Sequence, residues 1–282
     1  MFLPKIKKVL LLSGLFLILA SCSEYQKVLK EAEPGEKYAM AEQLYNEGLE
    51  EESNSKFRKA IRLFEQIVPQ YRGKPQGEKV TFLFADSYYH VGDNYLAGYQ
   101  FERFVQAYPN SDRVEEAQFK SAKSYYYLSP RYDLDQTETL KAIAELQKYA
   151  DAYPNGEYLQ EANELATALR VKLEQKDFEI AKQYHRIGDF GVRGENYKAA
   201  ILAFTNFINE HPGSPFREAA FYYRFDAAYQ YAINSYEYLM KERLTTAKDY
   251  YSNYMRFYSE EDEHYNAIQA SFTDLESRLQ NL

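Results

Sequence analysis

The chain contains no tryptophan and only one cysteine, and each shortage argues against particular kinds of binding site and chemistry. A single thiol forms no internal disulfide framework, no CxxC redox pair and no thiolate zinc site. The lack of tryptophan argues against a helical-repeat lipoprotein for glycan uptake, because such proteins use a tryptophan-lined sugar site. Strand signals are also scarce, since no alternating Val/Ile/Thr segments are joined by Asn-Gly turns. The sequence therefore predicts an all-helical protein without thiol chemistry.

The one cysteine, Cys22, directly follows a basic and then apolar segment at the start of the chain. Three lysines lie within residues 5–8, and residues 9–20 are mostly apolar. This run is shorter than the roughly 20 residues of a membrane-spanning helix and suits a secretory signal. The stretch LASC, which ends at Cys22, resembles a bacterial lipobox, in which the leader is removed and the cysteine receives diacylglycerol and an N-acyl chain.

We therefore expect residues 1–21 to be a lipoprotein signal peptide and residues 22–35 to be a lipidated tether. The alternatives are a secreted protein with a chance cysteine or an uncleaved anchor. Because the lipid would use the thiol of Cys22, no cysteine nucleophile remains, and the covalent lipid is the only non-protein group expected. Two or three acyl chains would hold the protein firmly on a membrane, whereas one chain binds reversibly.

The charge balance is acidic. Removal of residues 1–21 takes away three lysines and no acid, so the net charge falls from −8 to −11. Phosphate contacts require clustered lysine and arginine, so nucleic acid is not an expected partner. Anionic lipid would also repel such a chain, which leaves the acyl chains as the membrane attachment.

A repeated motif accounts for many of the aromatic residues. Five segments carry an alanine followed four and seven residues later by large, mostly aromatic residues, and these spacings place all three on one face of a helix. The small alanine lets a neighbouring helix approach closely. Proline follows three of the segments at Pro109, Pro154 and Pro212, and proline stops a helix. The alanines are Ala60, Ala97, Ala142, Ala200 and Ala247, and the segments end in FEQIVPQY, FERFVQAY, LQKYADAY, FTNFINEH and YSNYMRFY.

A partner helix precedes each of these segments. Residues 181–212 match the tetratricopeptide pattern of about 34 residues best. We expect an all-α solenoid of about five tetratricopeptide-like hairpins, with repeats 1–3 in residues 36–175 and repeats 4–5 in residues 176–282. Each hairpin should contact mainly its neighbours and leave a concave groove. Long turns are expected at 128–139 and 236–243, and a long helix over 157–184 should join the two groups.

No catalytic or metal-binding motif is present. The four histidines stand far apart and none lies in an HExxH motif. The acidic stretch DLDQTE lacks the glycine and terminal glutamate of a calcium loop. The stretch GVRGEN lacks the lysine of a phosphate-binding loop. The sequence therefore predicts neither an enzyme nor a metal site.

Tyrosine is abundant, with 29 residues, and not all of them fit repeat cores. Three consecutive tyrosines in SYYYLSPRY cannot all face one helix core, so some of them must be exposed. The segment FYYRFDAAYQYAINSYEY raises the same question. Tyrosine is favoured at interfaces because it is large, fairly rigid and polar at its tip. These runs indicate protein or peptide binding.

A lipobox followed by five such repeats, with phrases such as FERFVQAYPNS, resembles the BamD family of lipoproteins from the outer-membrane β-barrel assembly machinery. The likeness covers most of the chain. The third repeat carries a long Asp-containing turn before its own YPNG phrase. The long linking helix then leads to an aromatic-x-x-Ala-x-x-Tyr pattern at Phe178, Ala181 and Tyr184.

The resemblance implies a lipid-anchored protein on the periplasmic face of the outer membrane. Its implied partners are a BamA-like β-barrel subunit with periplasmic domains, other assembly lipoproteins and unfolded outer-membrane protein precursors. Its N-terminal repeats would hold precursors, and its C-terminal repeats would dock on the barrel subunit. We predict the groove residues Tyr88, Tyr89, Tyr95, Tyr125, Tyr126 and Tyr127, and the docking residues Tyr222, Tyr223, Tyr229, Tyr231 and Arg243.

The main alternative keeps the same fold and anchor but changes the partner. In that reading the chain is a lipidated tetratricopeptide scaffold of another cell-envelope complex, such as a division, secretion or motility machine. The sequence alone does not separate the two partners.

The lipobox yields a direct prediction. Mass spectrometry of the protein recovered from membranes should find a chain that begins at Cys22 and carries diacylglycerol and an N-acyl group. An exported protein with an unmodified Cys22 would contradict the anchor.

Overall fold

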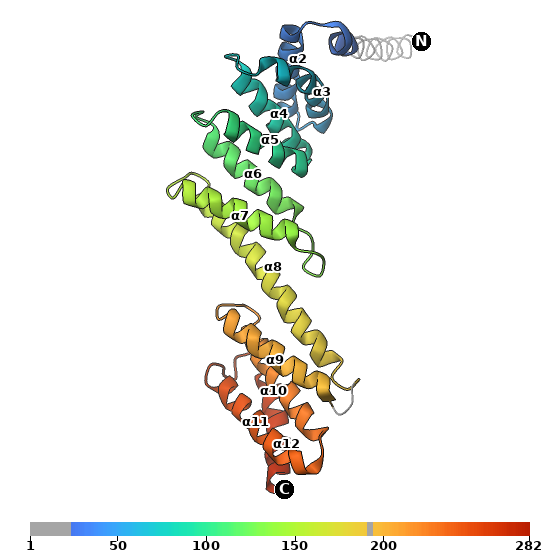
Figure 1. The fold of residues 1–282 in the computed structure, drawn as a ribbon, viewed down its shortest axis with the longest axis vertical. Helices are drawn as coiled ribbons and strands as arrows, with labels where there is room; N and C mark the ends of the chain where they lie inside the picture. Colours follow the sequence, from blue (N-terminus) through green and yellow to red (C-terminus); the bar gives the residue numbers. More distant parts are fainter. Residues whose placement is uncertain (1–23, 191–193) are drawn as a thin grey trace, which may run out of the picture. The chain divides into compact units, whose positions relative to one another are not determined.

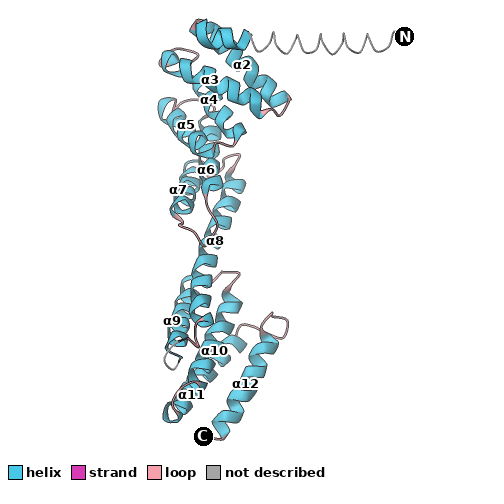
Figure 2. Cartoon of the chain, turned by 90° about the vertical axis from the view of Figure 1, so that its right-hand side faces the viewer, coloured by secondary structure: helices cyan, strands magenta, loops and turns pink. Residues whose placement is uncertain are grey.

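The structure, a computed structural model, describes residues 24–190 and 194–282, and in these ranges it consists of helices joined by turns and loops (Figure 2). No strand occurs in the described residues, which confirms the predicted all-α class. Residues 24–31 are helical and precede the labelled helices. These are α2 Pro34–Glu50, α3 Asn54–Tyr71, α4 Gly77–Val91, α5 Asn94–Ala107, α6 Val114–Leu128, α7 Thr137–Ala152, α8 Leu159–Arg186, α9 Glu195–Glu210, α10 Arg217–Ile233, α11 Glu237–Met255 and α12 Tyr265–Gln280.

The chain divides into two compact units. Unit 1 holds the described residues up to Ser129 together with Thr137–Ala166, and unit 2 holds Pro130–Gln136 and Thr167–Leu282. The predicted long helix is present as α8, and both units take part of it. The predicted long turn after α6 supplies residues 130–136, where Lys176 of α8 donates a hydrogen bond to the Leu134 carbonyl at 2.5 Å.

Within unit 1, α2 to α7 form successive antiparallel hairpins (Figure 1). The second helix of each hairpin carries the predicted alanine and large residues. All five repeat alanines are completely buried, including Ala200 and Ala247 in unit 2. Nine of the ten large residues beside them are buried as well, and the tenth, Tyr251, is half-buried; the nine are Phe64, Ile67, Phe101, Phe104, Leu146, Tyr149, Phe204, Phe207 and Tyr254. The repeat pattern read from the sequence is therefore the pattern of the core.

Two of the buried tyrosines, in different repeats, form the same kind of hydrogen bond from the hydroxyl group to a glutamate. Tyr149 donates to Glu115, in the first turn of the preceding helix, at 2.9 Å. Tyr254 donates likewise to Glu218. Each glutamate also accepts a backbone N–H from the start of the next helix, from Glu157 at 2.8 Å and from His264 at 3.3 Å. Tyrosine fits this position because a buried hydroxyl requires a partner and here finds one.

The turn between α4 and α5 follows the residues that form it. Gly92 ends α4 with φ of 79°, a left-handed conformation that glycine adopts without a Cβ clash. Asp93 then caps α5 and accepts the Leu96 N–H at 3.3 Å. The sequence VGDN therefore determines a tight turn between these two helices.

Two predicted connections differ from the structure. Residues 237–243, expected within a long turn, form the first turns of α11, because this stretch contains the helix formers Glu, Leu, Met and Lys and no glycine or proline. The segment expected as a tether contains the helix over residues 24–31. Tyr25 there is buried at 6% exposure and donates to the Lys59 carbonyl at 3.3 Å, so this segment packs against α3.

Among the described residues, no helix is both long and apolar enough to cross a membrane.

The buried alanines can be tested with a matched pair in α7, where Ala142 is fully buried and Ala144 is exposed. Ala142→Leu should destabilise the protein by about 1–3 kcal/mol, because extra atoms in a packed seam force the helices apart. Ala144→Leu should change the stability by less than about 0.5 kcal/mol. Urea unfolding followed by circular dichroism measures both, and equal effects would contradict the seam.

Candidate functional site

The first helices of the unit 1 hairpins share a buried carboxylate. Asp86 of α4 is 1% exposed and lies where α4 contacts α2 and α6. Its carboxylate accepts hydrogen bonds from Tyr45 of α2 at 2.5 Å and from Lys120 of α6 at 2.6 Å. His90, one turn later on α4, lies 3.3 Å from the same carboxylate. We call these four residues the Asp86 network.

The network keeps Asp86 ionised. Burial alone would raise the pKa of the Asp86 carboxyl, but the contacts with His90, Lys120 and Tyr45 outweigh burial and hold it well below its usual range. Burial alone would lower the pKa of Lys120, and the neighbouring Asp86 and Glu116 carboxylates raise it instead. The pair is therefore charged at neutral pH and connects α4 with α6, and the hydrogen bond from Tyr45 connects α2 to the same carboxylate.

A row of charged and aromatic groups continues from this network along α6. Glu116 accepts from Lys120 at 2.8 Å and from Arg113 at 2.9 Å. The Arg113 guanidinium lies 3.3 Å from the centre of the Phe82 ring. These contacts satisfy each charge within unit 1, so we assign them to holding α4 against α6.

The predicted groove tyrosines separate into buried and accessible residues. Tyr88 and Tyr125 are 7% and 2% exposed, so neither ring is available to a peptide. Tyr88 instead donates to Glu65 of α3 at 2.8 Å. Tyr95 is exposed at 64%, but it lies on α5, a second helix.

Tyr89, Tyr126 and Tyr127 remain as the accessible tyrosines of α4 and α6. Tyr89 and Tyr126 are half-buried, Tyr127 is exposed, and the rings of Tyr126 and Tyr127 meet edge to face at 5.6 Å. Lys123 lies among them and forms an ion pair with Glu161 at 2.6 Å. Burial would lower the pKa of Lys123, but Glu161, Tyr89 and Tyr127 raise it. We call Tyr89, Lys123, Tyr126 and Tyr127 the tyrosine face.

The predicted docking residues of unit 2 also fall into different environments. Tyr229 is buried at 6% exposure and donates to Asp274 of α12. Tyr231 is half-buried, and the Arg243 guanidinium lies 3.8 Å from the centre of its ring. Tyr231 and Arg243 therefore form one contact between α10 and α11, away from the buried Tyr229.

Tyr222 and Tyr223 pack against histidines that the sequence did not single out as functional. Tyr222 stacks on His264 with 4.5 Å between ring centres. Tyr223 lies 5.1 Å from the ring of His185, which is hydrogen-bonded to Asp226 at 2.6 Å. Burial, with a contribution from Asp226, raises the pKa of Tyr222 to about 12.

Sequence reasoning also missed two arginines of α10. Arg224 is only 7% exposed, its Nε lacks a hydrogen-bond partner, and no carboxylate of the described residues pairs with it. Its guanidinium lies 4.8 Å from the centre of the Phe221 ring, and that of Arg217 lies at the same distance from that ring. The Nε of Arg217 is buried without a partner too. No sequence signal marks them, because an arginine on a helix normally faces solvent.

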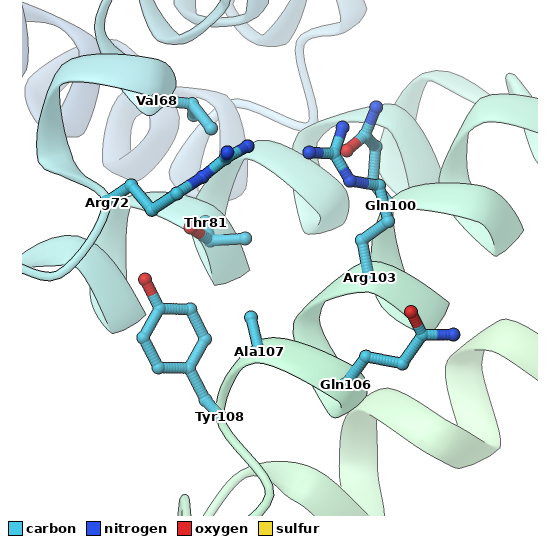
Figure 3. A pocket seen from close by; sticks show the side chains of 8 residues that line it. All are labelled: Val68, Arg72, Thr81, Gln100, Arg103, Gln106, Ala107 and Tyr108. Atoms are coloured by element: carbon cyan, nitrogen blue, oxygen red, sulfur yellow. The ribbon is translucent and has the colours of Figure 1, made fainter.

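Unit 1 also contains a polar pocket of about 260 Å³ where α3, α4 and α5 meet (Figure 3). Its walls include two arginines, Arg72 and Arg103, and no acidic residue. It was not predicted from the sequence, since the two arginines come from different helices.

The chain was compared with known proteins. It matches the YfiO family, described as outer membrane lipoprotein, over residues 37–191. The chain belongs to the YfiO family. The match begins near the start of α2 and ends shortly after α8, so it covers the Asp86 network, the tyrosine face and the polar pocket. No curated protein matches the chain.

Membership of the YfiO family supports an outer-membrane lipoprotein and a helical-repeat fold. Cys22, the predicted lipidation site, and the predicted signal peptide lie outside the described residues. The described residues contain no group of three or more His, Cys, Asp or Glu side chains that would hold a metal ion.

The Asp86 network predicts a pH-dependent stability. Asp86→Asn should destabilise the protein by about 3 kcal/mol at pH 7, because it removes the buried charge that Lys120 and His90 contact and leaves Lys120 with Glu116 as its one remaining carboxylate. The pKa of Asp86 is depressed in the folded state, so its stabilising effect is present above the unfolded value of about 3.9 and is lost as the pH falls below it. The difference between wild type and variant should therefore shrink below about pH 4.

Urea unfolding at several pH values measures this difference. Asp112→Asn is the matched control, since Asp112 is an exposed aspartate of the same unit. A variant Asp86→Asn that is as stable as the wild type at pH 7 would show that the network does not stabilise unit 1.

Proposed function

We propose that this YfiO family member is a non-enzymatic scaffold and substrate-receiving subunit of the β-barrel assembly machinery. In this proposal the lipid on Cys22 anchors it to the periplasmic face of the outer membrane. Its partners are a BamA-like barrel subunit, other assembly lipoproteins and unfolded barrel precursors. The observation that carries the proposal is the match to an outer membrane lipoprotein family across the helical repeats.

The tyrosine face of unit 1 suits weak binding of an unfolded chain. Precursor strands are rich in aromatic residues, and Tyr89, Tyr126 and Tyr127 offer rings with polar tips on two adjacent first helices. Aromatic pairs contribute about 0.5–1.5 kcal/mol beyond the burial of area, which favours capture that remains reversible. The Asp86 network beneath them keeps α4 and α6 in fixed register.

The surface between α10 and α11 in unit 2 suits a protein partner. Arg224 and Arg217 flank Phe221, and the exposed Phe257 lies 5.1 Å from the Arg217 guanidinium. Arginine and aromatic residues are the ones that most often dominate binding energy at interfaces. Arg217 is half-buried and forms no ion pair with a carboxylate of the described residues, so an acidic side chain of a partner would meet an unpaired charge there.

A second candidate is a lipidated scaffold of another envelope complex. It shares the repeats and the family, and it differs only in the protein that copurifies with the chain.

Affinity purification from solubilised outer membranes tests the proposal with two variants. Arg217→Met should reduce recovery of the partner by about tenfold or more, as expected for an accessible interface arginine. It should leave the stability of the chain nearly unchanged, because an apolar side chain of similar length fills the same space. Arg256→Met, which removes an exposed arginine of unit 2, is the control and should retain the partner.

The identity of the retained protein decides between the two candidates. A large barrel protein with periplasmic domains, together with general loss of β-barrel proteins when the chain is depleted, supports the assembly role. A different partner, with loss of one pathway alone, supports the second candidate and contradicts the first.

A further inference from the structure

The polar pocket of unit 1 is the feature that the proposed function leaves unexplained. It lies between the end of α3, the first turn of α4 and the end of α5, and its volume of about 260 Å³ is slightly below the usual range for small-molecule sites of about 300–1,000 Å³. It is lined by Val68, Arg72, Thr81, Gln100, Arg103, Gln106, Ala107 and Tyr108.

The two arginines of this pocket extend toward one another from different helices (Figure 3). Arg72 follows the last residue of α3, and Arg103 lies on α5. No carboxylate in the described residues forms an ion pair with either of them, although acidic residues outnumber basic ones in the chain. Two like charges directed into one hollow without a counterion within the chain indicate a site for an anion.

The remaining lining groups favour an anion with several oxygen atoms. The amides of Gln100 and Gln106 and the hydroxyl of Tyr108 provide further donors at the wall. The Thr81 hydroxyl donates to the Gly77 carbonyl at 2.7 Å and is therefore not one of these donors. Guanidinium groups present forked donors that match the spacing of phosphate oxygens.

The pocket is connected to the N-terminal segment of unit 1. Tyr71, the residue before Arg72, lies with its hydroxyl 3.5 Å from the Pro34 carbonyl. Residues 24–31 lead from there toward Cys22, and Tyr25 packs against α3. Because Tyr25 contacts Lys59, which lies twelve residues before Tyr71 on α3, residues 24–31 run along α3 away from the pocket.

We propose that Arg72 and Arg103 form a phosphate-binding site, with the phosphate supplied by a phospholipid headgroup or by a soluble phosphate compound. The two guanidinium groups hold the phosphate oxygens. A lipid headgroup in this site would orient unit 1 against the membrane surface. A soluble phosphate compound in this site would bind unit 1 without a membrane.

Both sources can be tested with the full mature chain carrying Cys22→Ser, so that no acyl chain holds it on a membrane. The first arm titrates inorganic phosphate by calorimetry, with sodium chloride holding the ionic strength constant. The second arm measures cosedimentation with vesicles of phosphatidylglycerol and phosphatidylcholine in equal parts, compared with phosphatidylcholine and an uncharged glycolipid. Sodium acetate replaces phosphate in a parallel titration.

Arg72→Gln and Arg103→Gln should each weaken binding by about tenfold or more, since each removes charge-assisted hydrogen bonds. Arg58→Gln removes an exposed arginine from α3 and should leave binding unchanged. Thermal unfolding without phosphate should be the same for all three variants, because these side chains are exposed.

Each outcome decides the proposal. Arginine-dependent binding of inorganic phosphate assigns a soluble ligand, and arginine-dependent binding of vesicles alone assigns the headgroup. The proposal is overturned if neither ligand binds, if acetate binds as well as phosphate, or if Arg58→Gln weakens binding as much as the pocket variants. These results do not depend on which protein copurifies with the chain, so the assembly role and the phosphate site fail or stand separately.

Discussion

The close approach of helices at buried alanines is the constraint on which the rest of the structure depends. In every hairpin the second helix places an alanine with no exposed surface beside large residues that fill the adjoining space. Each large side chain contributes roughly 1.5–3 kcal/mol when it is buried, but only if the neighbouring backbone comes near enough to cover it. The alanines make that approach possible, and the same arrangement recurs in both units.

This packing forces polar groups into the interior, and the chain satisfies them in pairs. The hydroxyls of Tyr149 and Tyr254 meet Glu115 and Glu218. Asp86 meets Tyr45 and Lys120 from two neighbouring helices. Such pairs add little net stability over an apolar core, but removing one partner is costly, so they determine which helix faces which. The abundance of tyrosine is thus partly structural. A tyrosine hydroxyl forms a hydrogen bond to a neighbouring helix, whereas phenylalanine at the same position would contribute packing alone.

Arginine side chains that have no partner in these internal pairs contribute to the surfaces proposed for function. Arg224 and Arg217 in unit 2 and Arg72 and Arg103 in unit 1 have no carboxylate partner among the described residues, in a chain with more acids than bases. The first pair lies among aromatic rings and suits an acidic protein surface. The second pair lines a polar pocket and suits a phosphate. The difference follows from the neighbouring side chains rather than from the arginines themselves.

The amino-acid sequence by itself determined the all-helical class, the five repeated seams, the long helix α8 and the tight turn at Gly92, because these depend on local spacing and on residues that end helices. The prediction of a turn over residues 237–243 was wrong although these residues favour a helix, because it was inferred from the repeat spacing and not from their own helix propensity. The sequence did not separate Tyr88 and Tyr125, which are core residues, from Tyr89 and Tyr127, which reach the surface, because neighbouring positions on a helix differ only in what packs against them. The Asp86 network and the Arg72–Arg103 pocket were decided by the tertiary structure alone, since their members come from different segments and meet only after the hairpins stack, and Arg217 and Arg224, although both on α10, lack a carboxylate partner because of what packs around that helix.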